Sequence, residues 1–496
     1  MKKINLLILL MMTINLSTFA QDSMDDELLL DIFAEETEEP ILEIDREPEI
    51  IIEQDQVLEE SEKSPSLIDQ LYSNLQGETK GVYVYYFNEL TQPDYTTYSP
   101  EHDQHIFEAK TIKSTFAQIS NIRLKADLIS FFGNEEERYR PALANPENMN
   151  ITDWIQNKNN ERLFLSFKEL YMSVFFDNFD IYLGKKIISN TLSTIYSPAD
   201  IYSPVDLVDP FSSEPFGNIL LEFDYYFNNI DITAIILPVY QGNKNYSQLS
   251  RWGYYPFVEA AASAPFTITA LQENYPEINL ENISYLLKLK TRVKSVDLFT
   301  SAFYGLNQNI VTKTITTMGI PTGGEEEVIP VIQASAGFSS TLKKLELHGE
   351  GLYNYSLNSK DDNYLSYCGG LRYIFDEFSA PILPGRLELT MEYAGEYLMS
   401  EQSHEDYMLS SSDRRGLKND LLLSTEATYN EDLLFRVSGQ YEFDDKNLMT
   451  LTEVSYKGIE NIKLNLRWQH FVTSDDGDLY NWRDNSSLVT EAIISY

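Results

Sequence analysis

The stretch from Asn461 to Gln469, NIKLNLRWQ, alternates apolar and polar side chains at every position. Its apolar residues therefore lie on one face of an extended chain and its polar residues on the other, which is the period of a β-strand with two different faces. Residues 121–128 and 433–443 show the same alternation. Because strands of a soluble β-sandwich alternate too, a single strand does not distinguish the architectures, and the connections between strands must decide.

The alternation continues from about residue 80 to residue 496 and predicts about eighteen strands. Most of these segments are long enough for a tilted strand that crosses a membrane in roughly 9–11 residues. An even number of strands is typical of bacterial outer-membrane barrels. We expect strands near 80–88, 105–119, 121–132, 162–176, 179–187, 217–227, 230–240, 283–293, 295–306, 330–341, 344–355, 363–376, 385–399, 417–429, 432–443, 446–457, 460–472 and 486–496.

The connections alternate between long and short. Long ones include 89–104, 133–161, 188–216, 241–282 and 307–329, and tight turns fall at Ser120, 177–178, 228–229, Lys294, Lys343 and 430–431. Two connections fit poorly, because 377–384 is long for a turn and 444–445 is short for a loop. In an up-and-down barrel, short turns lie on the periplasmic side and long loops outside. The sequence therefore predicts an all-β transmembrane antiparallel barrel of about 18 strands (16–18), with both termini periplasmic.

Three regions are predicted along the chain. Residues 1–20 have the basic start, apolar run and small final residue of a signal peptide, with Lys2, Lys3 and Ala20 in those places. Residues 21–79 are predicted to form an acidic, largely disordered periplasmic arm with a short helix near 67–75, which either binds a periplasmic partner or is a solvated tail. Residues 80–496 are predicted to form the barrel. The formal charge of −40 argues against nucleic-acid binding.

The predicted inner face of the barrel carries charges of both signs, which orient polar solutes and favour a water-filled lumen. The pore-lining candidates are Arg123, Lys125, Asp127, Glu222, Asp224, Lys288, Lys290, Glu346, Glu350, Lys463 and Arg467, and Arg292, Glu388 and Glu392 are expected on the same face. The single cysteine, Cys368, excludes an internal disulfide and is expected to face lipid or neighbouring side chains.

The connection 188–216 is a candidate constriction loop. Pro198, Pro204 and Pro210 make it rigid, and its acids are Asp200, Asp206 and Asp209. If the loop folds inward, these carboxylates narrow the pore and act on passing ions. The alternative interpretation is that each aspartate only caps a local turn.

Residues 168–186, KELYMSVFFDNFDIYLGKK, and residues 197–207, SPADIYSPVDL, carry a family resemblance. They resemble the strand, hairpin and loop of porin-like outer-membrane proteins related to alginate-export barrels, over about residues 168–210. The resemblance implies a porin-like barrel. The chain lacks the Trp-Gly that usually follows the glycine-basic pair, so no substrate is carried over from the family.

The last predicted strand places Leu488, Thr490, Ala492, Ile494 and Tyr496 on one face. It resembles the C-terminal strand that the outer-membrane assembly machinery recognises, which implies that machinery and outer-membrane lipid as partners.

The sequence gives no indication of an enzyme, a cofactor or a metal site. The five histidines are scattered, and neither a phosphate-binding glycine loop nor a Gly-x-Ser-x-Gly motif is present. We therefore expect a channel for passive passage of small hydrophilic solutes in the outer membrane of a diderm bacterium. The alternative is a structural or adhesive barrel that binds ligands through long external loops, especially 241–282.

Overall fold

The computed structural model describes residues 66–88, 104–133, 163–207, 214–245, 251–252, 271–274, 276–317, 320–379, 384–401, 407–409, 415–429, 431–474 and 478–496. The expected signal peptide, most of the expected acidic arm, Asp209 and Pro210 lie outside the described residues.

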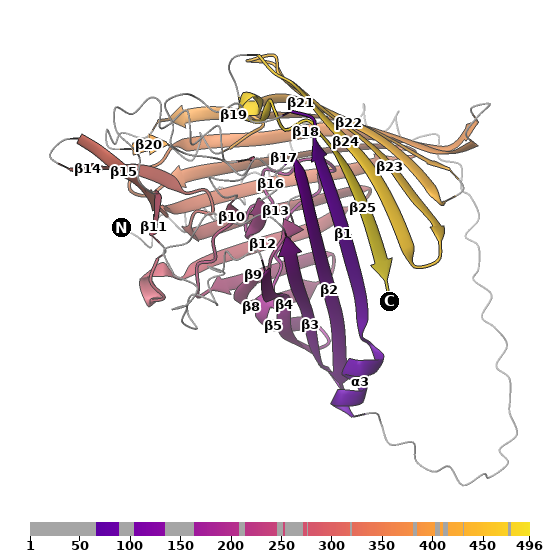
Figure 1. Ribbon diagram of the computed structural model, residues 1–496. Coiled ribbons are helices and arrows are strands. Elements are labelled where there is room, and N and C mark those ends of the chain that lie inside the picture. Colours follow the sequence, from indigo (N-terminus) through magenta and orange to yellow (C-terminus); the bar gives the residue numbers. More distant parts are fainter. Residues whose placement is uncertain are drawn as a thin grey trace, which may run out of the picture. The chain divides into compact units, whose positions relative to one another are not determined.

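An 18-stranded antiparallel sheet closes on itself, because β1 pairs with both β2 and β25 (Figure 1). This confirms the predicted all-β barrel of about 18 strands. Its strands are β1 (Gln76–Tyr86), β2 (His105–Ile119), β3 (Ile122–Gly133), β4 (Leu163–Phe175), β5 (Phe179–Lys186), β8 (Asn218–Phe227), β9 (Ile230–Leu237), β12 (Ser284–Val293), β13 (Val296–Leu306), β16 (Pro330–Leu342), β17 (Leu345–Ser356), β18 (Asn363–Ser379), β19 (Pro384–Ser400), β21 (Asn419–Tyr429), β22 (Leu433–Glu442), β23 (Leu448–Ile459), β24 (Ile462–Val472) and β25 (Ser487–Ser495).

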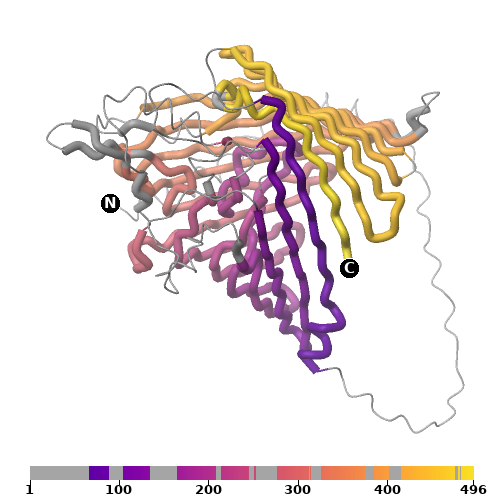
Figure 2. Tube along the Cα trace, viewed as in Figure 1, coloured from indigo at the N-terminus to yellow at the C-terminus, as the bar shows by residue number. Residues whose placement is uncertain are grey.

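Consecutive barrel strands run up and down, as the tube in Figure 2 shows, so short turns gather at one end of the barrel and long connections at the other. Several tight turns place a residue in the left-handed region, including Ser120, Asn228, Lys294, Lys343 and Asn461. Two-residue hairpin turns need such positive φ values to match the twist of the strands. Of the two connections that fitted poorly in sequence, the first is shortened, because β18 ends at Ser379 and β19 begins at Pro384. The second stays short for the long-loop end, because only residues 443–447 separate β22 from β23.

The long connections contain short strands that the alternation did not predict. One small sheet joins β6 (Val205–Leu207), β7 (Glu214–Pro215) and β10 (Lys244–Asn245). Another joins β11 (Leu271–Asn274), β14 (Val311–Thr317), β15 (Ile320–Glu327) and β20 (Tyr407–Leu409). Both sheets pair segments from different connections, so the loops at this end are tied to one another.

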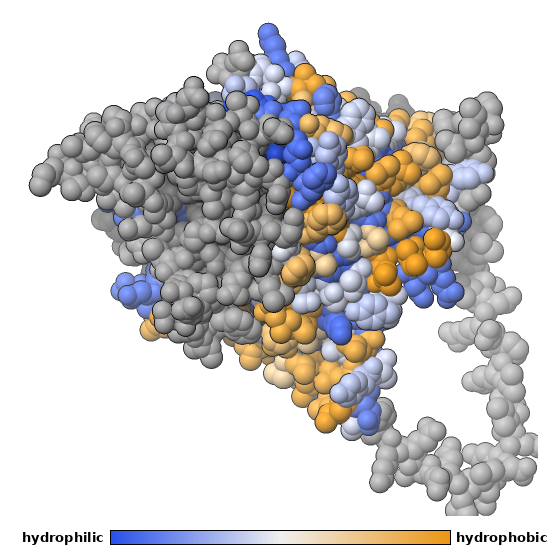
Figure 3. Space-filling view, in the orientation of Figure 1, coloured by the Kyte–Doolittle hydropathy of each residue, from blue (hydrophilic) through white to orange (hydrophobic). Residues whose placement is uncertain are grey.

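The two faces of the barrel wall are reversed relative to a soluble protein. Along β24, Leu464, Leu466 and Trp468 are exposed on the outer face, whereas Asn465 and Gln469 are buried on the inner face. The space-filling view shows apolar side chains over the outer wall (Figure 3). An outer surface with so many exposed apolar residues is suited to lipid rather than to water.

Cys368 on β18 shares the inner face with Tyr364 and Arg372, and its Sγ lies 3.6 Å from Glu392 Oε2. It therefore points into the barrel among neighbouring side chains and not towards the outer, lipid-facing surface.

The predicted short helix is present as α3 (Leu67–Ser73). Ser66 caps its start: the Asp69 N–H donates to Ser66 Oγ, and the Ser66 N–H donates to Asp69 Oδ2. This reciprocal capping box defines the first helical residue. Within the described residues, no helix has the length and apolar character needed to cross a membrane.

Candidate functional site

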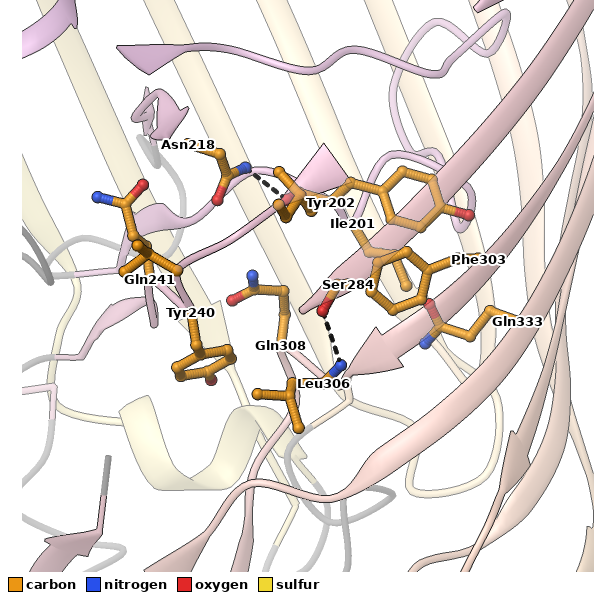
Figure 4. Close-up of a pocket in the computed structure, with 12 residues that line it drawn as sticks. Ile201, Tyr202, Asn218, Tyr240, Gln241, Ser284, Phe303, Leu306, Gln308 and Gln333 are labelled. Atoms are coloured by element: carbon orange, nitrogen blue, oxygen red, sulfur yellow. Dashed lines mark hydrogen bonds between the residues drawn. The ribbon is translucent and has the colours of Figure 1, made fainter. Parts of the chain in front are cut away.

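Residues 187–204, here called the inner loop, lie against the inner wall of the barrel. Ile188 and Tyr202 of the loop belong to one buried apolar cluster with wall residues of five strands, namely Leu220, Ile235, Leu237, Leu286, Phe303 and Val331. Figure 4 shows Ile201 and Tyr202 beside Phe303, and the ring centroids of Tyr202 and Phe303 are 5.3 Å apart. Leu220 and Leu286 share the inner face with Glu222 and Lys288, so this packing places the loop inside the barrel.

Polar contacts fix the start of the inner loop to the same part of the wall. Asn190 Nδ2 donates to Ser335 Oγ at 3.2 Å and to Ser301 Oγ at 3.4 Å. Lys288 Nζ donates to Ser189 O at 2.6 Å. The wall therefore satisfies loop groups that would otherwise need water, which lowers the cost of burying them.

The Glu350 carboxylate on β17 accepts hydrogen bonds from four donors of the inner loop. Its Oε1 accepts from the Ser193 N–H at 2.7 Å, from Thr191 Oγ1 at 3.1 Å and from the Leu192 N–H. Its Oε2 accepts from Ser197 Oγ. Glu350 was predicted to line the pore, and the structure places it on the inner face, but its carboxylate is occupied by the loop.

The Glu392 carboxylate on β19 holds the next three residues. Its Oε1 accepts from the N–H groups of Thr194 at 2.9 Å and Ile195 at 2.8 Å, and its Oε2 accepts from the Tyr196 N–H at 2.9 Å. The side chain is 0% exposed, and His348 Nε2 lies 2.9 Å from Oε1. Hydrogen bonds to a charged acceptor are shorter and stronger than neutral ones. Two wall glutamates thus bind an unbroken run of backbone donors from Leu192 to Tyr196.

The three predicted loop aspartates have different environments. Asp200 Oδ1 accepts a hydrogen bond from the Asn190 N–H at 2.7 Å, which joins two parts of the inner loop ten residues apart. Part of the Asp200 side chain stays exposed. Loss of water around its carboxylate raises the pKa of Asp200, and the hydrogen bond from the Asn190 N–H opposes this rise. Asp206 lies on β6, opposite Lys244 of β10.

The predicted pore-lining residues occupy the inner-facing positions of β3, β8, β12, β17 and β24. They are Arg123, Lys125, Asp127, Glu222, Asp224, Lys288, Lys290, Glu346, Glu350, Lys463 and Arg467. Several of these charges are paired, and some of the partners, such as Glu169, were not predicted. Lys125 Nζ lies 2.6 Å from Glu169 Oε2 and 3.1 Å from Asp127 Oδ2.

Further pairs follow the same inner face. Glu222 pairs with Lys186, and Arg372 links Glu388, at 2.6 Å, to Glu346, at 3.4 Å. Arg467 Nη2 lies 3.9 Å from Glu491 Oε1, and Arg123 Nη2 donates to Gln118 Oε1 at 2.9 Å. Opposite charges that neutralise each other along the wall keep it polar without giving it one dominant sign.

A small cavity lies between the inner loop and the wall (Figure 4). Tyr202 and Asn218 line one side, and Ser284, Leu306 and Gln333 line the other. Asn218 Nδ2 donates to Tyr202 O at 2.7 Å, and the Leu306 N–H donates to Ser284 Oγ at 3.1 Å. Its polar lining groups are thus partly used in holding the loop end.

Among the residues that the structure describes, there is no group of three or more His, Cys, Asp or Glu side chains that could hold a metal ion.

Several solved structures resemble this chain over most of its length. OccAB1 of Acinetobacter baumannii has a TM-score of 0.48 and 7% identity, with 85% of this chain and 95% of that chain covered. OccK5 (OpdH) of Pseudomonas aeruginosa has a TM-score of 0.44 and 10% identity, with coverages of 85% and 97%. A BenF-like porin from Pseudomonas fluorescens has a TM-score of 0.44 and 8% identity, with the same coverages. No family model matches the sequence, and no curated protein matches it. With identities of at most 10% and TM-scores below 0.5, the likeness says nothing of what this chain does.

Proposed function

We propose that this chain is an outer-membrane channel for the passive passage of small hydrophilic solutes, and that the inner loop forms its constriction. The observation that carries the proposal is the attachment of the loop to the inner wall by Glu350 and Glu392. The ion-paired side chains of the inner wall around the loop are suited to a water-filled lumen.

The reversed faces of the wall support the membrane location. A closed barrel pairs every backbone donor and acceptor between strands, so it can cross hydrocarbon without unsatisfied groups. The exposed apolar side chains of the outer face meet lipid, and the charged side chains of the inner face meet water. The short-turn end, where β1 begins and β25 ends, is then the periplasmic end of a barrel in a diderm outer membrane.

The proposal also includes several roles and partners that the sequence predicts. The pore-lining roles of the inner charges and the constricting role of Asp200, Asp206 and Asp209 are among them. Recognition of the last strand by the assembly machinery, a periplasmic partner for the acidic arm and the relation to alginate-export barrels are others. The expectation that the chain is not an enzyme also stays a prediction.

A paired-cysteine experiment tests the proposal. In a Cys368→Ala background, Lys290→Cys places a thiol on the inner face of β12, and Leu289→Cys places one on the outer face. Purified variants inserted into planar bilayers should conduct in unitary steps. A bulky charged methanethiosulfonate reagent should lower the step size of the variant with the inner thiol and leave that of the other unchanged.

This matched pair also excludes contaminating channels, since a contaminant carries neither thiol. Bilayers that stay sealed, although the protein is folded and inserted, would contradict the channel and favour the structural or adhesive alternative. Steps that the reagent leaves unchanged at position 290 would show that the current does not pass through this lumen.

A further inference from the structure

Helix α3 lies on the outer side of the barrel wall, at the short-turn end, at the foot of β1 and β2 (Figure 1). Thr115 and Ala117 of β2 point to the outer face, like their partners Ala126 and Leu124 on β3. Thr115 Oγ1 donates to Leu71 O of the helix at 2.6 Å. Ala117 is only 1% exposed although it faces outward, which places the helix over it.

The helix also occupies the edge that β1 leaves open. The pairing of β1 with β2 begins at Gln76 and Ser114, so the last residues of β2 extend beyond it. There, Asn74 Nδ2 donates to Phe116 O at 2.9 Å, and the Gln118 N–H donates to Gln70 Oε1 at 2.8 Å. These side chains replace missing ladder bonds at a place where lipid would not supply them. The same bonds fix the rotation of the helix about its axis.

With the rotation fixed, the two flanks of the helix differ. Ile68 and Tyr72 follow the spacing of four residues that puts helical side chains on one flank, and they are 64% and 76% exposed. Leu75, which follows the C-cap residue Asn74, is 45% exposed. Asp69 and Ser73, also four residues apart, point about 100° further round the helix axis than Ile68 and Tyr72. The apolar residues Ile119 and Ile122 beside the helix, at the β2–β3 turn, are also exposed on the outer face. The apolar flank therefore continues the lipid-facing surface of the barrel.

We propose that α3 is an interfacial helix whose Ile68–Tyr72 flank, together with Leu75 just after the helix, binds the boundary between headgroups and acyl chains of the periplasmic leaflet. A helix with one apolar and one polar flank lies in the interface plane, and a tyrosine there keeps its ring in apolar surroundings and its hydroxyl near water. Asp69 is held in the capping box by Ser66, so its charge stays on the aqueous flank. The occupant of this surface is phospholipid, and the inference rests on the proposed membrane location of the barrel.

Depth measurements with nitroxide labels test this proposal. Tyr72→Cys and Ser73→Cys are neighbours whose side chains point about 100° apart round the helix axis, and Leu466→Cys on the outer face of β24 is the reference for lipid. Each is made in the full chain with Cys368→Ala, labelled, and reconstituted into nanodiscs of phosphatidylethanolamine and phosphatidylglycerol. Heat-modifiable migration on gels verifies that each variant has folded.

Oxygen, which concentrates in lipid, should relax the label at position 72 several-fold more than Ni-EDDA, which stays in water, and the order should reverse at position 73. If Ni-EDDA dominates at both helix positions while position 466 is in lipid, the interfacial helix is refuted and the membrane barrel stands. A label at position 72 that is shielded from both reagents would also overturn the proposal, because protein then covers the flank. If position 466 itself is accessible to Ni-EDDA, the proposed membrane location fails.

Discussion

Replacing Glu392 with glutamine should loosen the inner loop. The carboxylate accepts three backbone N–H groups from Thr194 to Tyr196 at 2.8–2.9 Å. Glutamine keeps one acceptor oxygen but turns an N–H donor towards the Tyr196 N–H, and the remaining bonds lose their charge. Because a hydrogen bond to a charged group contributes about 1.5–3 kcal/mol, we expect the attachment to weaken by about 2–4 kcal/mol.

That loss raises the ratio of detached to attached loop by a factor of roughly 30 to 1,000, since 1.4 kcal/mol corresponds to a tenfold change. In planar bilayers, Glu392→Gln should therefore show a larger mean unitary conductance than the parent and frequent transitions between levels. The parent should hold one steady level under the same salt and voltage.

Glu388→Gln is the matched control. Glu388 lies on the same strand and the same inner face, and it pairs with Arg372 and Arg386 instead of accepting from the loop. The Glu388→Gln substitution removes the same charge as Glu392→Gln, so any purely electrostatic change in conductance should appear in both variants. If Glu392→Gln folds normally and its conductance and noise equal those of Glu388→Gln, the wall glutamate does not hold the loop and the reasoning is refuted.

Three further predictions follow from the barrel. Replacing Asp200, Asp206 and Asp209 together with asparagine should lower cation preference in reversal-potential measurements, most clearly at low salt; replacing Glu273 and Glu277 with glutamine should do much less, and equal effects would contradict a constriction at the inner loop. Epitope tags at 148, 253 or 324 should bind antibody on intact cells while tags at 178, 229 or 430 should not, and reversed accessibility would invert the proposed orientation. Gly184→Ala should destabilise the barrel by about 1–3 kcal/mol, seen as a lower temperature of heat-modified migration, because its φ is +133° and a Cβ would lie 2.4 Å from Leu170 O; Gly81→Ala, whose Cβ would approach no atom closer than 4.0 Å, should be neutral by comparison.

The architecture could be predicted because its main signals are local. Each spanning strand must present one face to apolar surroundings and one to polar surroundings, so the period of two appears within a single segment. The strand predicted at 460–472 is observed as β24, Ile462–Val472, and the helix predicted near 67–75 is observed as α3, Leu67–Ser73. The lengths of the connections added the information that one strand alone lacks, since up-and-down order follows from their alternation.

The contacts of the site could not be predicted because they depend on register between distant strands. Lys125 and Glu169 are 44 residues apart, and they meet because β3 and β4 pair in one particular register. The short strands of the long connections were missed for a related reason. A pairing such as that of β11 with β15 joins residues about fifty positions apart. A strand as short as β11, with 4 residues, is also too short to show a period of two.

The inner loop shows how both kinds of information combine. Its donors from Leu192 to Tyr196 are backbone N–H groups, which every residue except proline possesses, so no side-chain motif in the loop identifies the attachment. The residues that select the attachment lie instead in the wall, where the carboxylates of Glu350 and Glu392 accept these N–H groups. A wall glutamate that holds backbone groups and one that faces water look the same in sequence. What distinguishes them is the position of the loop, which the packing of Ile188 and Tyr202 holds against β8, β9, β12, β13 and β16.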